Sequence, residues 1–202
     1  GVAVFPLLHL LSQTREIYPL SRVRKSDAKR VEQAVAVQDF YGEVPEPYDE
    51  GYKEFLNEVK TALILRGWIN ERSEKALYDA YGATPGEIHG KVSRAEWLLH
   101  SLSQLLKVKQ EDRNLVEKLH LRMKHGVKEE VLSLLKLSNI GRVRARKLWS
   151  HSIKDVKDIR ATSYERLSSI LGPSIAKSVH EQVGKTVTQE LDEKTGTLLD
   201  FT

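Results

Sequence analysis

Apolar residues recur at helical spacing along most of the chain, in segments such as PLLHLLSQ, AKRVEQAVAV and YKEFLNEVKTALILRGWI. Spacings of three and four residues place them on one face of an α-helix, whereas a half-buried strand requires strict alternation. No segment alternates convincingly with a period of two. The pattern is interrupted where Pro and Gly gather, at 42–49 (GEVPEPYD) and 83–86 (ATPG). The sequence therefore predicts an all-α fold.

The helical pattern changes character near Gly126. Before it, long amphipathic segments predict a multi-helix bundle over residues 1–126, with Gly126 as the C-cap of the last helix. After it, EEVLSLLKL and later segments predict short helices joined by tight turns, which form a small second domain over 127–192. The remaining residues, 193–202, read as a C-terminal tail with an apolar end.

Composition limits the classes of function. Of 202 residues, 40% are hydrophobic and 30% are charged, which is typical of a globular protein that is neither disordered nor embedded in a membrane. The apolar opening, GVAVFPLLHLL, is too short to span a bilayer and lacks the basic start of a signal peptide. The chain begins at Gly rather than Met, which suggests a fragment or a processed product. Cysteine is absent, so thiol chemistry is excluded, and this composition fits an intracellular, cytoplasmic protein.

Positive charge is concentrated in one part of the chain. The window 122–149 contains eight basic residues and two acidic ones, so it carries +6, whereas the whole chain carries +4. A local positive patch indicates a polyanionic partner more strongly than a uniformly high isoelectric point does.

An internal repeat lies in and after this window. Gly141 and Ala145 are spaced as Gly172 and Ala176 are, at a distance of 31 residues, and an aliphatic residue precedes each Gly. This is the helix-hairpin-helix pattern, in which a glycine lets the amides at the start of the second helix approach a phosphate closely. Asn139 stands where most such hairpins have a first Gly, and Asn tolerates the left-handed backbone region.

The first hairpin is followed directly by basic residues, which are Arg142, Arg144, Arg146 and Lys147. Arg142 and Arg146 are four residues apart, so they share a helix face and could straddle a sugar-phosphate backbone. Arg144 is expected to point elsewhere. The alternative is that these side chains are solvated or paired with carboxylates, and the candidates are Glu129, Glu130 and Asp155. The second hairpin has only Lys177 nearby, so we interpret it as a structural partner.

Trp97 is the exception in an otherwise well-patterned helix. At about 100° per residue, the apolar residues of 92–106 form one face, and Trp97 falls nearly opposite, in a stripe with Arg94, Ser101 and Gln104. An exposed indole can stack on unpaired bases, while Arg94, one turn away, holds the adjacent phosphate. The alternative is that Trp97 packs against another helix or against a domain outside this chain. The sequence leaves the two alternatives open.

Two long stretches resemble a known family. YGATPGEIHGKVSRAEWLLHSLSQLL (81–106) and LRMKHGVKEEVLSLLKLSNIGRVRARKLW (121–149) are similar to the C-terminal region of archaeal Hjm-type DNA helicases, relatives of eukaryotic HelQ in helicase superfamily 2. PLLHLLSQT resembles the start of that family's helical-bundle domain. The resemblance covers nearly the whole chain.

The resemblance implies a division of labour. In this family two RecA-like motor domains hydrolyse ATP with Mg, a winged helix follows, and a helical bundle closes a ring around the translocating strand. A ratchet helix in the bundle, here about 92–107, contacts the bases, and a final helix-hairpin-helix domain binds the emerging strand. By similarity, Trp97 is the stacking residue and the hairpin arginines are the basic contacts. The family often has an arginine where this chain has His89 and Gly90, so Lys91 or Arg94 is the expected substitute.

These observations support a non-motor, DNA-binding part of an ATP-dependent helicase that contacts single-stranded or forked DNA in replication-coupled repair. No phosphate loop, metal-binding pattern or catalytic cluster is recognisable, so no cofactor is expected in this segment, and ATP and Mg are assigned to the parent's motors. The rival interpretation is a regulatory module that docks on motor domains or on a sliding clamp. TGTLLDFT (195–202) weakly resembles a clamp-binding peptide, with Leu198 and Phe201 as anchors.

Overall fold

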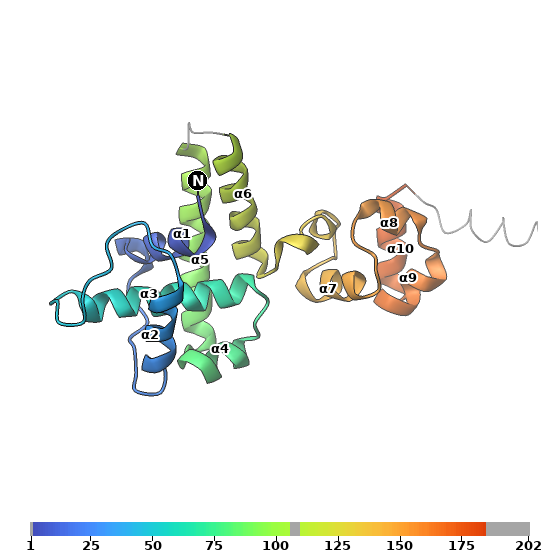
Figure 1. Cartoon of the computed structure of the whole chain (residues 1–202). Coiled ribbons are helices and arrows are strands. Elements are labelled where there is room, and N and C mark those ends of the chain that lie inside the picture. The colour runs from blue at the N-terminus through green and yellow to red at the C-terminus, as the bar shows by residue number, and fades with distance from the viewer. Residues whose placement is uncertain (1, 106–109, 185–202) are drawn as a thin grey trace, which may run out of the picture. The chain divides into compact units, whose positions relative to one another are not determined.

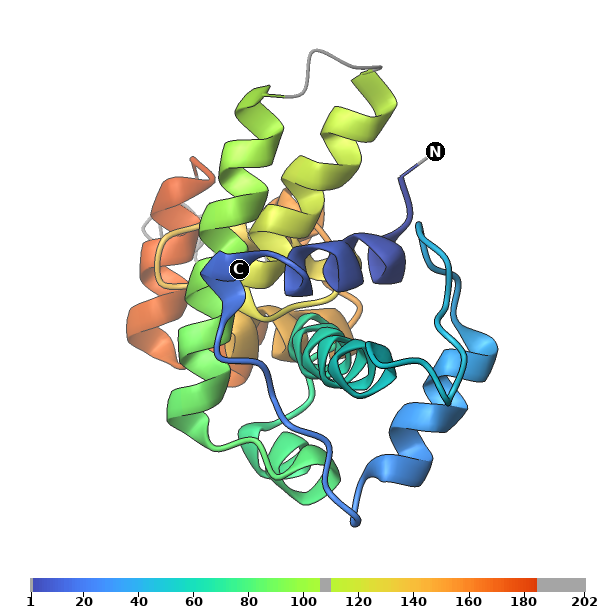
Figure 2. The same ribbon diagram turned by 90° about the vertical axis from the view of Figure 1, so that its left-hand side faces the viewer.

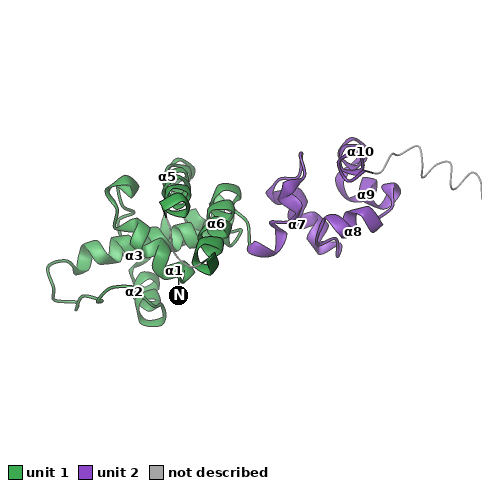
Figure 3. Ribbon diagram, turned by 90° about the horizontal axis from the view of Figure 1, so that it is seen from above, with its two compact units in different colours: residues 1–128 green, residues 129–202 purple. Residues whose placement is uncertain are grey.

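The computed structural model describes residues 2–105 and 110–184, and among these it contains helices and no strand, which confirms the predicted all-α class (Figure 1). The chain divides into two compact units, of which the first ends at Lys128 and the second begins at Glu129 (Figure 3). No helix in the described ranges is long and apolar enough to cross a membrane. The same ranges contain no group of His, Cys, Asp or Glu side chains placed to hold a metal ion.

The first unit is built around helix α3. Its helices are α1 (Val4–Ser12), α2 (Ala28–Val37), α3 (Tyr52–Ile69), α4 (Glu74–Tyr81), α5 (Pro85–Leu105) and α6 (Gln110–His125), with a 3₁₀ turn at Arg15–Ile17. Viewed along its axis in Figure 2, α3 lies in the centre, and the other helices of the unit surround it. Because partners cover it on several sides, α3 buries apolar residues around most of its circumference, among them Val59, Ile64 and Leu65.

Helix α5 is longer than the sequence pattern suggests. It begins at Pro85 rather than near residue 92, and its last described residue is Leu105. Proline is well suited to the first turn of a helix because its missing N–H has no intrahelical acceptor there. The hydroxyl of Thr84 accepts a hydrogen bond from the amide of Glu87 at 3.4 Å, which caps the helix start. Helix α6 ends as predicted, because Gly126 has a φ of 64° and donates its N–H to the carbonyl of Arg122.

The second unit consists of short helices, which are α7 (Arg142–Ser150), α8 (Val156–Ala161), α9 (Tyr164–Leu171) and α10 (Pro173–Gln182). The helix expected in EEVLSLLKL does not form. Two 3₁₀ turns replace it, at Glu129–Val131 and Leu134–Lys136. The reason is visible in the spacing of the buried residues there, since Val131, Leu134 and Leu137 recur every third residue. A three-residue period keeps one face buried on a 3₁₀ helix, whereas an α-helix would rotate it away.

Candidate nucleic-acid interface

The first hairpin joins the 3₁₀ turns to α7 and places an open glycine at the start of that helix. Asn139 has a φ of 66°, so it occupies the left-handed region expected for it, and its side-chain amide donates to Ser178 Oγ at 3.3 Å. Gly141 has an ordinary extended backbone, so its φ does not require glycine. A Cβ at Gly141 would meet no atom within 4 Å. The missing side chain therefore leaves open space beside the first turn of α7, where helix amides point outward.

The two alanines of the repeat lie in the interior of the second unit. Ala145 on α7 and Ala176 on α10 both have 0% exposure. Any larger side chain at these positions would have to displace the packed helices around it. These small residues therefore allow the helices of the second unit to pack closely, and this packing supports the hairpins.

The basic side chains after the hairpin differ in their surroundings. Arg146 Nη2 lies 3.0 Å from Glu130 Oε1, with side chains that are 32% and 38% exposed, so one of the carboxylate pairings considered from the sequence is present. Arg144 is also engaged within the hairpin, because its Nη1 donates to the carbonyl of Asn139 at 2.9 Å. Arg142 is the first residue of α7, and Lys147 is exposed. Each guanidinium has five N–H donors, so one such hydrogen bond does not exhaust its capacity to bind a phosphate.

The hairpin also presents an apolar residue that sequence reasoning did not single out. Val143, in the first turn of α7, is 78% exposed. The signal was available, because Val143 is the lone branched aliphatic residue among the arginines of RVRAR. Its position places an apolar side chain between the basic ones.

Trp97 is 59% exposed on α5, and Arg94, three residues earlier on the same helix, is also exposed. The opposite face of α5 is buried, with Val92, Ala95 and Leu99 in the core. More than half of the Trp97 surface is therefore exposed in the described part of the chain, which disfavours the alternative that Trp97 packs against another helix of this unit. An uncovered indole with a cation one turn away can stack on a base and bind the adjoining phosphate.

Lys91 is a correction to the predicted site. Its side chain is 3% exposed, its ammonium donates to the carbonyl of Pro19, and it lies 3.6 Å from the carboxylate of Glu87. Burial lowers the pKa of Lys91, and the neighbouring Glu87 opposes that shift. This lysine joins α5 to the segment before α2 and is not available to a strand. Sequence reasoning missed this because it treats a charged residue next to the apolar face as exposed.

His89 is also used within the unit. Its Nε2 lies 2.8 Å from Glu74 Oε1, and its ring packs edge-on against Trp68. Trp68 donates its indole N–H to the carbonyl of Met123 at 2.8 Å, so it packs at the end of α3 against α6. Arg94 is therefore the basic side chain next to Trp97 that remains from the predicted set. Leu198 and Phe201, the predicted clamp-binding anchors, lie outside the described residues.

Comparison with known proteins identifies the class. Residues 5–126 match the family model of domain 4 of archaeal helicases, and residues 131–185 match a SAM-like helix-hairpin-helix tandem. The chain therefore belongs to the archaeal helicase family, as the sequence resemblance indicated.

Three similar proteins share the name ATP-dependent DNA helicase Hel308. The chain is 33% identical to the ATP-dependent DNA helicase Hel308 of Thermococcus kodakarensis over 98% of its own length and 18% of the relative's. It is 33% identical to Hel308 of Pyrococcus abyssi over 95% of its length and 27% of the relative's. With Hel308 of Thermoplasma acidophilum, identity is 41% over 58% of this chain and 18% of the relative. The chain thus spans between about a fifth and a quarter of the length of these relatives.

Proposed function

We propose that this chain is the non-motor, DNA-binding part of an ATP-dependent DNA helicase and that it holds the translocated single strand at forks during replication-coupled repair. The observation that carries the proposal is the exposed indole of Trp97 on the polar face of α5. A tryptophan left uncovered by its own unit loses the free energy of burial, which base stacking can restore. The names of the relatives, all ATP-dependent DNA helicases, support the same role.

The two units take different parts of the strand in this proposal. Trp97 and Arg94 contact a base and its phosphate, and the hairpin before α7 contacts phosphates through its arginines and helix amides. Neither contact reads a base edge, so the chain should bind with little sequence preference. The RecA-like motors and the winged helix of the parent protein supply ATP hydrolysis, with ATP and Mg bound there.

The test is a titration of the chain with labelled single-stranded DNA. Binding is measured by the fluorescence anisotropy of the label and by the quenching of tryptophan fluorescence. Trp97→Ala should weaken binding by about fivefold or more, because one base stack contributes roughly 1–3 kcal/mol. Trp97→Phe should recover part of the loss. Tyr48→Ala is the matched control, because Tyr48 is an aromatic residue with 85% exposure in the same unit. Equal affinities for wild type, Trp97→Ala and Tyr48→Ala would remove the stacking role.

The hairpin is tested by the salt dependence of the same titration. Arg142→Ala and Arg144→Ala should each weaken binding and should flatten the slope of log K against log salt by about 0.7 for each phosphate that is no longer neutralised. Lys157→Ala, which removes an exposed cation on α8, is the control for loss of charge in the same unit. If the wild-type chain has no DNA affinity, the regulatory interpretation replaces this one, and a protein partner becomes the ligand to seek.

A further inference from the structure

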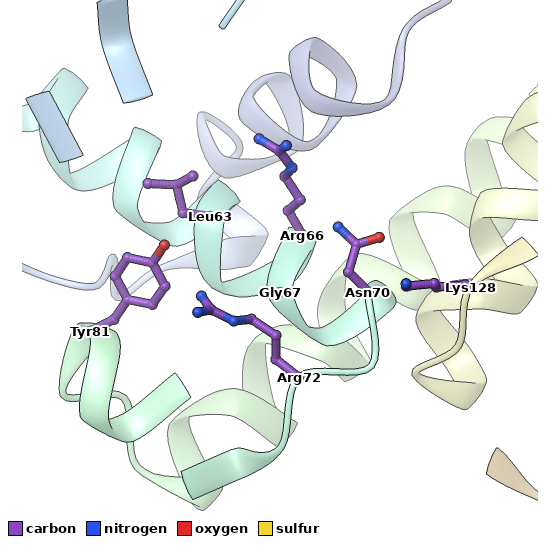
Figure 4. Close-up of a pocket in the computed structure, with 7 residues that line it drawn as sticks. All are labelled: Leu63, Arg66, Gly67, Asn70, Arg72, Tyr81 and Lys128. Carbon is purple, nitrogen blue, oxygen red and sulfur yellow. The ribbon is translucent and has the colours of Figure 1, made fainter. Parts of the chain in front are cut away.

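A hollow of about 540 Å³ lies at the C-terminal end of α3, within the first unit (Figure 4). Its polar lining consists of the cations Arg66, Arg72 and Lys128 together with Asn70 and Tyr81. No carboxylate is among its lining residues. Neither α5 nor the hairpin contributes to it. The hollow therefore combines three positive charges with neutral polar groups.

Gly67 allows Arg72 to approach this hollow. A Cβ at Gly67 would lie 2.5 Å from Leu77 Cδ2 and 3.3 Å from Arg72 Cδ. Without that atom, α4 and the aliphatic stem of Arg72 close directly over α3. The turn itself is a Schellman-type cap, in which the N–H of Arg72 reaches the carbonyl of Gly67 at 3.0 Å while Glu71 adopts a φ of 64°. The position of Arg72 is thus determined by the backbone.

Lys128 and Asn70 are held beside Arg72 by separate contacts. The backbone N–H of Lys128 donates to Glu71 Oε1 at 3.1 Å, which ties the segment after α6 to the turn. Asn70 Oδ1 accepts from Arg122 at 3.2 Å, so its amide nitrogen is the atom left as a donor, and in Figure 4 that nitrogen is turned to the side of Arg66. The Cζ atom of Arg66 lies 5.6 Å from the centre of the Phe5 ring, over its face.

Capping of α3 does not account for this gathering of cations. The carbonyls of Arg66, Gly67 and Trp68 accept backbone N–H groups from the turn. The carbonyl of Ile69 accepts from Arg122. The partial negative charge at the end of α3 is about half a unit, and Glu71 adds one negative charge beside Lys128, so together they are smaller than the three positive charges of Arg66, Arg72 and Lys128. A ligand that carries negative charge would therefore be attracted into the hollow.

We propose that this hollow is a phosphate-binding site for the backbone of a nucleic-acid strand, distinct from the α5 and hairpin contacts. Guanidinium groups bind phosphate oxygens in pairs, and an ammonium adds a compact charge. The volume exceeds that of a bare phosphate, so a sugar-phosphate unit can enter. The inference rests on the proposed function, because it takes the phosphate to belong to a bound strand.

The test uses the full chain and the same labelled single strand. Arg72→Gln combined with Lys128→Gln keeps much of each stem and removes two charges. We expect about tenfold weaker binding, because charge-assisted hydrogen bonds to the phosphate are lost, and a salt slope flatter by about 0.7. Lys25→Gln with Lys29→Gln removes two exposed charges from the same unit, and it should change affinity by less than about twofold. Lys128→Gln alone should show part of the loss of affinity. Because Lys128 is exposed, this substitution should leave the fold intact, so it separates a lost contact from misfolding.

The outcomes separate this inference from the proposed function. If the pocket variant matches the lysine control while Trp97→Ala still weakens binding, the strand site is refuted and the DNA-binding function stands. If the wild-type chain binds no DNA, pyrophosphate replaces the strand as the probe. Its binding is then monitored by NMR through the backbone amide resonances of Asn70, Arg72 and Lys128. Shifts that saturate in wild type and vanish in the pocket variant would support a site for free phosphate. Unmoved resonances would overturn it.

Discussion

Arg146 shows how a neighbouring carboxylate can compete with a predicted contact. Its guanidinium lies 3.0 Å from Glu130, and both side chains are about a third exposed, so the pair is a weak one that water screens. A phosphate that approaches the hairpin competes with Glu130 for the same N–H groups. If the hairpin binds a strand as proposed, Glu130 should weaken that binding without changing the hairpin itself.

Replacement of Glu130 by Gln should strengthen DNA binding by about two- to fivefold, because a partly exposed ion pair contributes less than about 1 kcal/mol. Glu181→Gln removes one exposed negative charge elsewhere in the same unit, and so controls for the change in net charge. The gain should disappear when Arg146→Ala is already present. An equal gain for Glu130→Gln in both backgrounds would mean that Arg146 makes no contact with the strand.

At the scale of elements, the helical segments AKRVEQAVAV and YKEFLNEVKTALILRGWI coincide with α2 and α3, and the end of α6 at Gly126 was predicted. These are features that local chemistry decides, through apolar spacing and the freedom of glycine at positive φ. The start of α5 was missed although TPGE has the Thr and Glu spacing of a capping box, because the glycines near Pro85 read as a break. The outward side of Trp97 was predictable from the helical period alone.

The buried charged residues and the hollow depend on contacts between segments that are distant in sequence. Hydrophobic periodicity does not reveal such contacts. Lys60 lies within the buried part of α3 because Asp27, 2.7 Å away, pairs with it, and both side chains are 2% exposed. Lys91 can be buried for the same reason, because its ammonium has a polar partner in the carbonyl of Pro19. The hollow beside Arg72 depends on an atom that glycine lacks, the Cβ at Gly67, and on Lys128, which is distant in sequence. None of these pairings is encoded within one segment.

The end of α6 makes the stability of the first unit sensitive to pH. Burial lowers the pKa of His125, Lys124 and His120 lower it further, and Glu96 opposes the shift. The unfolded chain therefore takes up the proton first as the pH falls through about 6.5, and the folded state loses stability below that value. Chemical denaturation between pH 8 and pH 5 should show this loss. His125→Gln should differ from wild type by a constant amount above pH 7 and should gain relative to wild type below about pH 6.5. A pH-independent difference would contradict the shift.

At the scale of the whole molecule, each unit has a core of its own. The buried cluster that includes Leu8, Ile64 and Leu99 lies wholly within the first unit. In the second unit, Leu134, Leu148 and Ile159 are each fully buried. When two independently packed units on one chain bind the same strand, binding at one raises the local concentration of the strand at the other.

The two units should therefore bind a strand more tightly together than apart. Residues 1–128 and 129–202, prepared separately and shown to be helical by circular dichroism, should each bind a long oligonucleotide weakly. The joined chain should bind it about a hundredfold or more tightly than either, the range expected when two linked modules engage one ligand. A mixture of the separate units is the control for additive binding, and shortening the oligonucleotide should abolish the gain once it no longer reaches both units. If the joined chain binds no more tightly than the mixture at every length, the units do not share one strand.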